Sequence, residues 1–117
     1  MENEELNTKI SVLAPDISLE QVVVSVARYY QIEQDFLFKV IKGPQSENLP
    51  RKIAMYLCQE LTGAKLHEIA ELFGLSSGGS VGFITHDIRK KCTVETRLAM
   101  NIEEIRKSII GQKNLTP

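Results

Sequence analysis

Residues 66–91 read LHEIAELFGLSSGGSVGFITHDIRKK, and this stretch decides the fold. Apolar residues recur at three- and four-residue spacing, which predicts one helix ending at Gly74 and another beginning near Gly78. The small Ala70 lets the two helices cross closely, and Gly74 can open the turn with a backbone angle that most residues avoid. We expect Ser77 to cap the second helix. The inner face of that helix is expected to consist of Val81, Ile84 and Ile88.

This pattern is typical of a helix-turn-helix. In that motif the outer face of the second helix is free to enter the major groove of DNA, which is ~12 Å wide. Helix pairs with an alanine and a turn glycine also occur in plain bundles, so the pattern alone leaves both interpretations open. Val81 follows Gly74 by seven positions, one more than in the commonest version, which predicts a turn that is one residue longer.

Helical periodicity continues on both sides of the motif. It predicts helices over about residues 19–30, 33–40 and 50–62, with a polar loop over 42–49. The last helix is expected to bury one stripe, formed by Leu98, Ile102, Ile105 and Ile109. Together with the pair around the turn, these segments predict an all-α fold of about six helices with no strand.

The domain boundaries are expected where the periodicity stops. We predict one helical domain over residues 17–111, after a flexible tail or linker over 1–16 and before a tail over 112–117. A chain of 117 residues with 43% hydrophobic content can bury one core. It contains neither an apolar run of ~20 residues nor a basic-then-apolar start, so neither membrane insertion nor export is expected.

The cysteines and histidines suggest no catalytic or metal site. Cys58 and Cys92 lie far apart, and neither His67 nor His86 has a partner at metal-binding spacing. Paired carboxylates, a phosphate-binding glycine loop and an activated nucleophile are also missing from the sequence. We therefore expect a cytoplasmic protein that binds rather than catalyses and that needs no cofactor or metal.

Charge is unevenly distributed around the net value of −1. Residues 1–49 hold 4 Lys+Arg against 8 Asp+Glu, whereas residues 50–117 hold 10 against 7. An electropositive surface is therefore expected in the second half. The basic residues near the turn are candidates for phosphate contacts, although they could equally be ordinary solvated charges. They are Arg51, Lys52, Arg89, Lys90 and Lys91, with Lys39 and Lys42 as weaker candidates.

The residues in and after the turn are candidates for contacts with DNA. Backbone N–H groups of residues 77–80 could seat a phosphate at a helix start, although these residues could also form an ordinary flexible turn. Phe83 and His86 lie opposite the inner face and are either exposed or packed on a neighbouring helix. If they are exposed, Phe83 could touch a thymine methyl and His86 a phosphate or base edge. The full candidate set is Arg51, Lys52, Ser76, Ser77, Gly78, Gly79, Ser80, Phe83, His86, Arg89 and Lys90.

Short motifs follow one another in the order and spacing of a known family. They are Tyr29-Tyr30-Gln31-Ile32, Pro50-Arg51, Ala54-Met55-Tyr56-Leu57, Glu60-Leu61-Thr62, Glu68-Ile69 and Phe73-Gly74. Over about residues 17–110 the chain thereby resembles the C-terminal domain of the bacterial replication initiator DnaA, which also has the longer turn. The resemblance implies a Trp repressor-like helix-turn-helix fold and double-stranded DNA as the partner.

The departures from the family concern the residues that contact DNA. The family continues with Gly-Arg-Asp-His-Thr-Thr-Val, whose Asp, His and Thr read bases of the origin box, whereas residues 75–81 here read LSSGGSV. The family's arginine-rich loop is matched by residues 42–49, with one lysine. We therefore expect no preference for the origin box. The Ser/Gly-rich turn is closer to a similar domain in REP-associated transposases.

The family's nucleotide-binding domain is missing from this sequence. The resemblance therefore implies a fragment or a stand-alone relative that belongs to a replication- or transposition-related protein. A catalytic domain or protein partner could complete it. The alternative is a protein-interaction module that kept the scaffold and lost DNA binding.

Overall fold

The computed structural model describes residues 17–39 and 48–115, and every regular element in these ranges is helical. The elements are α2 (Leu19–Tyr30), the 3₁₀ helix η1 (Gln34–Phe38), α3 (Leu49–Leu61), α4 (Leu66–Phe73), α5 (Gly78–Cys92) and α6 (Thr96–Leu115). The all-α prediction is confirmed. The predicted tail over residues 1–16 and most of the predicted loop over 42–49 lie outside the described residues.

Two boundaries differ from the sequence-based expectation. The segment predicted as a helix over 33–40 is a single 3₁₀ stretch of five residues. The carbonyls of Phe36 and Lys39 both accept hydrogen bonds from the Asn48 side-chain amide, at 2.8 and 3.1 Å, and the Phe36 carbonyl also accepts from the Lys39 amide at 3.2 Å, so Asn48 holds the end of this segment. At the other end of the chain, α6 continues past residue 111 to Leu115.

Two helices begin at side-chain caps. The Ser18 hydroxyl accepts a hydrogen bond from the Gln21 amide at 3.1 Å, as the capping-box pattern predicts. Asn48 Oδ1 accepts from the Arg51 amide at 3.1 Å, and proline occupies the first turn of α3. These caps satisfy backbone donors that have no partner inside the helix and thereby fix where α2 and α3 begin.

Two helices end in left-handed residues. Gly74 ends α4 with φ +73°, and the next amide, that of Leu75, donates to the Ala70 carbonyl at 2.8 Å. Gln31 ends α2 in the same conformation, with φ 56°, although it is not a glycine. Gly74 has the positive φ expected of it from the sequence, because a residue without a Cβ reaches this region without steric cost.

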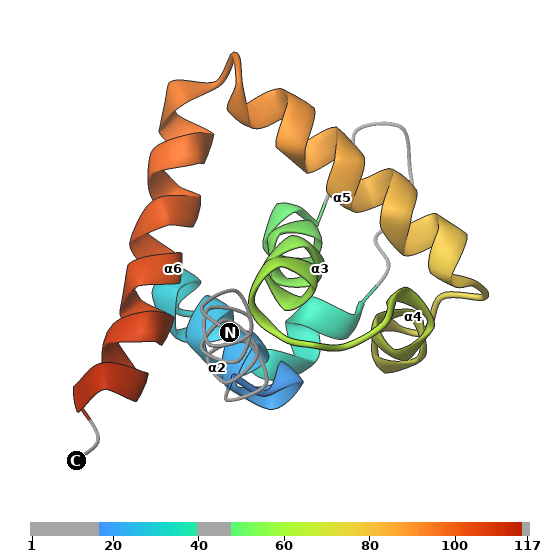
Figure 1. Ribbon diagram of the computed structural model, residues 1–117, viewed down its shortest axis with the longest axis horizontal. Coiled ribbons are helices and arrows are strands. Elements are labelled where there is room, and N and C mark those ends of the chain that lie inside the picture. The colour runs from blue at the N-terminus through green and yellow to red at the C-terminus, as the bar shows by residue number, and fades with distance from the viewer. Residues whose placement is uncertain (1–16, 40–47, 116–117) are drawn as a thin grey trace, which may run out of the picture.

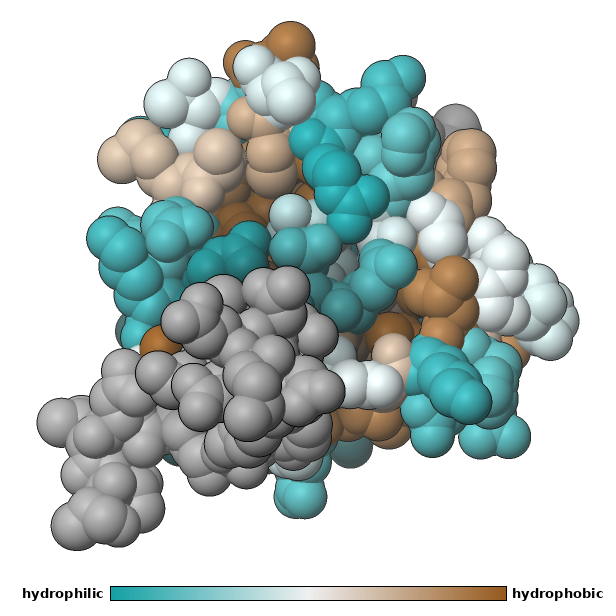
Figure 2. Space-filling model, viewed as in Figure 1, coloured by the Kyte–Doolittle hydropathy of each residue, from teal (hydrophilic) through white to brown (hydrophobic). Residues whose placement is uncertain are grey.

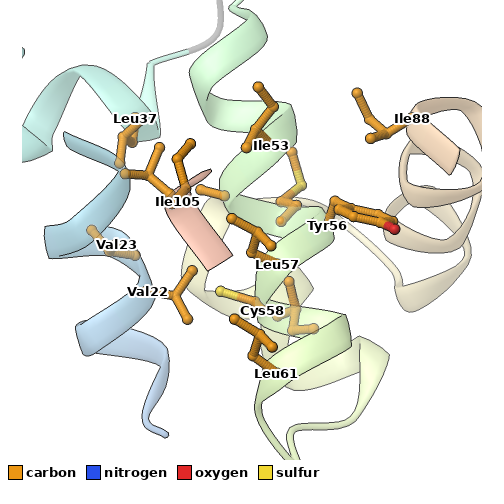
Figure 3. Packing of buried hydrophobic residues seen from close by; sticks show 14 of the residues in the cluster. Val22, Val23, Leu37, Ile53, Tyr56, Leu57, Cys58, Leu61, Ile88 and Ile105 are labelled. Carbon is orange, nitrogen blue, oxygen red and sulfur yellow. The ribbon is translucent and has the colours of Figure 1, made fainter. Parts of the chain in front are cut away.

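The core is built around α3, which lies in the middle of the molecule with α2, α4 and α5 around it (Figure 1). Helix α6 stands along one side, packed on α2 and on the end of α5. In Figure 3, Leu57 and Cys58 of α3 face Val22 of α2, while Tyr56 extends from α3 toward α5. Fully buried large side chains come from η1 and from all five α-helices. They are Val22, Val26, Leu37, Ile53, Met55, Leu57, Ile69, Phe73, Val81, Ile88, Ile105 and Ile109.

The last helix buries the stripe expected from the sequence. Leu98, Ile102, Ile105 and Ile109 are all at most 5% exposed. Among the described residues, no helix combines the length and the apolar character that crossing a membrane requires. In the view of Figure 2, hydrophobic surface occurs in separate small areas among polar ones.

Candidate nucleic-acid interface

Helices α4 and α5 cross at very close range at the start of α5. A Cβ added to Gly78 would lie 3.0 Å from Leu66 Cβ and 3.1 Å from the His67 backbone nitrogen. Contacts this short are tighter than nine in ten real Cβ contacts, so a side chain at position 78 would require the backbone of α4 to move by a few tenths of an ångström. Ala70, buried on α4, is the small residue that the sequence placed at this crossing.

The inner face of α5 differs by one residue from the expected one. Val81 and Ile88 are fully buried as predicted, but the third buried position is Thr85 rather than Ile84, which is half-buried. The Thr85 hydroxyl donates to the Gly82 carbonyl at 3.2 Å, and this hydrogen bond satisfies the polar group. Sequence reasoning missed Thr85 because the hydrophobic pattern favours an isoleucine at a buried site.

The opposite face of α5 points into solvent. Gly79, Phe83, His86 and Lys90 are all exposed, and their spacing of four, three and four residues places them on one side of the helix. We call these four residues the outward stripe of α5. Phe83 is 77% exposed, so of the two alternatives for Phe83 and His86 the structure supports exposure.

The serines of the turn lie beside the start of the outward stripe. Ser76 and Ser77 are exposed and Ser80 is half-buried. Ser77 is the N-cap residue, as predicted, but its hydroxyl makes no capping hydrogen bond; its carbonyl accepts from the Ser80 amide at 3.2 Å. The N-terminal end of the α5 dipole is therefore not neutralised by this side chain.

Arg51 does not lie where a phosphate contact requires it. Its side chain is buried: one guanidinium nitrogen donates to the Leu37 carbonyl at 3.2 Å and the other to the Phe73 carbonyl at 2.8 Å. The guanidinium also lies 5.6 Å from the centre of the Phe73 ring. Burial lowers the pKa of this group. Arg51 thus joins the ends of η1 and α4, and this placement corrects the expectation of a solvent-facing cation.

The basic end of α5 is partly neutralised by carboxylates. Arg89 donates to Glu60 Oε2 at 2.9 Å and lies 5.6 Å from the centre of the Tyr56 ring. The hydrogen bond with Glu60 raises the pKa of Arg89. Lys91 pairs with Asp87, one turn earlier on α5, at 3.3 Å. The positive field of this cluster is weaker than the sequence suggests.

The other basic candidates are spread over the surface. Lys90 is exposed on the outward stripe, Lys52 is half-buried on α3, and Lys39 is exposed after η1. Lys42 lies outside the described residues. The structure therefore brings Ser76, Ser77, Gly79, Phe83, His86 and Lys90 together around α5 and separates Arg51 from them.

Sequence reasoning missed two polar residues that support this surface. Glu60 accepts from Arg89 and also lies 3.8 Å from Arg106 of α6, so it links three helices. Asn48 caps α3 and holds η1, and its place directly before Leu49 and Pro50 was an available N-cap signal. No comparable local signal marks Glu60, because its partners are distant in sequence.

The described residues offer little for metal or thiol chemistry. They contain no group of three His, Cys, Asp or Glu side chains placed to hold a metal ion. Cys58 is buried in the core, and burial raises the pKa of its thiol to about 12. A thiol with this pKa stays protonated at neutral pH, so Cys58 acts as a small core residue.

Comparison with known proteins identifies the family. A family model described as bacterial dnaA protein helix-turn-helix matches residues 19–81, more than half of the chain. The chain belongs to this family.

The DnaA relatives share the domain but are much longer. The chain is 32% identical over 94 residues to the chromosomal replication initiator protein DnaA of Geobacter sp. strain M21, and 37% identical over 87 residues to that of Leptothrix cholodnii. The first alignment covers 80% of this chain and 20% of the relative; the second covers 74% and 16%. The chain thus spans about a fifth of the length of the curated relatives it matches.

The span that the family model matches ends early in α5, whereas the alignments to the DnaA relatives, over 94 and 87 residues of this chain, extend past it. The matched span ends at residue 81, in the first turn of that helix. The family model therefore covers the scaffold that positions α5, whereas Phe83, His86 and Lys90 lie beyond it.

Proposed function

We propose that this domain binds double-stranded DNA by laying the outward stripe of α5 in the major groove. The observation that carries the proposal is that the second helix of a DnaA-family helix-turn-helix presents a row of exposed residues from its first turn to its last. A helix is about 10–12 Å wide, which fits a groove of ~12 Å. The proposed activity is binding without catalysis, in the bacterial cytoplasm.

The N-terminal end of α5 supplies the orientation. The amides of residues 78 and 79 belong to the first helical turn, and the Ser77 hydroxyl does not cap them. A helix start without a side-chain cap and with an uncompensated dipole favours a phosphate oxygen. Such a contact fixes the position of α5 on the duplex, and the residues that follow reach the base edges.

Binding is proposed to be sequence-specific, with a preference different from that of the origin box. Two of the four positions that match the family's base-reading residues are Gly78 and Gly79, which have no side chain. The remaining side chains that could reach base edges are Ser80, Phe83 and His86. The similarity to chromosomal replication initiators supports a role in replication, and the Ser/Gly-rich turn favours a transposase-associated role. The genes and domains adjacent to this sequence would separate the two.

A salt titration tests the proposal. Lys90, Arg89 and at most one other basic side chain near the turn are expected to neutralise two or three phosphates. At about −0.9 per phosphate, the slope of log K against log salt is then expected to be about −2 to −3. Lys90→Ala is expected to flatten the slope by about 1. Lys107→Ala, which changes an exposed lysine of α6, is the matched control and leaves it unchanged.

A protein-interaction module is the second candidate. The observations that favour it are the inward-facing Arg51 and the carboxylate partners of Arg89 and Lys91, which all reduce the charge available to phosphates. If no duplex binds at low salt, this second function replaces DNA binding.

A further inference from the structure

Phe83 is the feature of the outward stripe that polar recognition of DNA does not explain. The residue is 77% exposed, although a phenylalanine side chain gains roughly 1.5–3 kcal/mol from full burial. Phe83 does not pack α5 onto the core, because Val81, Thr85 and Ile88 do so from the opposite side of the helix.

The surface around Phe83 leaves the ring standing clear. Gly79 is one turn before it on the same face, and Gly82 precedes it directly, so neither neighbour has a side chain beside the ring. Gly79 is exposed, and a Cβ added there would meet only Ser77 Oγ, at 3.6 Å. This part of α5 can therefore approach another surface closely, and the ring would be the first group to make contact.

The position of Phe83 along α5 places it at the level of the base edges when α5 lies in the major groove. It follows the helix start at Gly78 by five residues, or about one and a half turns at 3.6 residues per turn. In helix-turn-helix complexes the phosphates contact the start of the second helix, and residues in its N-terminal half contact base edges. An apolar ring at this position can pack favourably only on an apolar group at the edge of a base.

The major groove displays one such feature, the C5-methyl group of thymine. We propose that Phe83 is a specificity-determining residue that packs on a thymine methyl and selects a thymine at one position of the site. This inference rests on the proposed function, since it requires α5 to lie in the major groove. His86, one turn further along the outward stripe, can bond a neighbouring base edge or phosphate.

The experiment uses uracil as a probe, because it pairs like thymine and lacks only the methyl group. A duplex is first selected from a random pool with the parent chain at low salt. Each thymine of that duplex is then replaced in turn by uracil, and the affinities of the parent and of Phe83→Ala are measured. Phe83→Leu tests rescue by an apolar side chain, and Met100→Ala, another exposed apolar residue on α6, is the control.

At one thymine, the parent is expected to bind the uracil duplex about fourfold more weakly, which corresponds to the ~0.8 kcal/mol gained on burying one methyl-sized group. Phe83→Ala is expected to bind both duplexes equally, Phe83→Leu to keep most of the discrimination, and Met100→Ala to behave as the parent. If the parent binds DNA but is indifferent to every uracil replacement, or if Phe83→Ala discriminates as well as the parent, this inference is overturned and the proposed function stands. Failure of the parent to retain any duplex overturns both.

Discussion

Single residues decide how close the two helices of the motif come. Gly78 lets the start of α5 lie against the backbone of α4, whereas Gly82 meets only Leu66 Cδ1, at 3.7 Å, an ordinary contact distance. Both glycines belong to the same helix, but only at the first would a side chain meet tight contacts with α4. The close approach of α4 thus explains the glycine at position 78, independently of any contact with DNA.

Gly78→Ala and Gly82→Ala are therefore expected to change stability in opposite directions. Gly78→Ala should lower the free energy of unfolding by about 1–3 kcal/mol, because the added methyl forces α4 and α5 apart. Gly82→Ala should raise it by up to about 1 kcal/mol through helix propensity. Urea denaturation followed by circular dichroism measures both. Equal effects of the two variants would show that the close approach at Gly78 does not matter.

The inward orientation of the Arg51 side chain is set by its two carbonyl partners. Arg51→Met is expected to lower the free energy of unfolding by about 2–3 kcal/mol, because it removes charge-assisted hydrogen bonds to the Leu37 and Phe73 carbonyls and leaves these carbonyls buried. Lys90→Met, at an exposed site, should change it by less than about 0.5 kcal/mol. The same urea denaturation compares them. An Arg51→Met variant that is as stable as the parent but no longer binds DNA would restore the phosphate contact expected from sequence.

At the scale of elements, the phenol of Tyr29 on α2 forms hydrogen bonds with side chains of the long helix α6. The Tyr29 hydroxyl donates to Glu104 Oε1 at 2.7 Å and lies 3.2 Å from Asn101 Oδ1. The hydrogen bond to Glu104, followed by burial, raises the pKa of Tyr29 from 10.0 to about 12. The folded state therefore favours the protonated phenol, and this contribution to stability is complete below pH 10 and is lost as the pH rises to about 12.

Tyr29→Phe removes this dependence on pH. At neutral pH the variant is expected to be less stable than the parent by about 0.5–1 kcal/mol, a small value because the hydrogen bond is exposed to water. Between pH 10 and 12 the difference should shrink toward zero, because the phenol of the unfolded parent loses its proton from about pH 10 while the folded parent keeps it up to about pH 12. Denaturation of both proteins across this range tests the effect. A difference that stays constant up to pH 12 would contradict the role given to Glu104.

At the scale of the whole molecule, the sequence predicted the scaffold better than the surface. Helical periodicity is a local signal, so it identified α2, α3, α4, α5 and the buried stripe of α6. The glycine at position 74 was also predictable, because its left-handed conformation is a requirement of the turn itself. The charge partners were not, since Glu60 lies 29 residues from Arg89, and Arg51 bonds carbonyls 14 and 22 residues away.

The same limit explains the error at Arg51. A basic residue near a motif is equally consistent with a solvated cation and with an inward-facing guanidinium, and only the packed chain distinguishes the two. Phe83 illustrates the opposite case, because its place opposite the buried face of α5 is encoded in helical spacing. Its exposure could be anticipated but not decided from the sequence, since a neighbouring helix could have covered it.

The most direct test of the central claim is to map which amides change when DNA is added. In a titration of the isotope-labelled protein with a duplex at low salt, followed by NMR, the account predicts that the largest shift changes fall on residues 76–90. Residues of α2 and of α6 beyond residue 100 should change little, because α5 turns its buried face, with Val81 and Ile88, toward the core that these helices help to form. Changes confined to α2 or α6, or no change in α5 at saturating DNA, would contradict the claim that α5 is the helix that binds DNA.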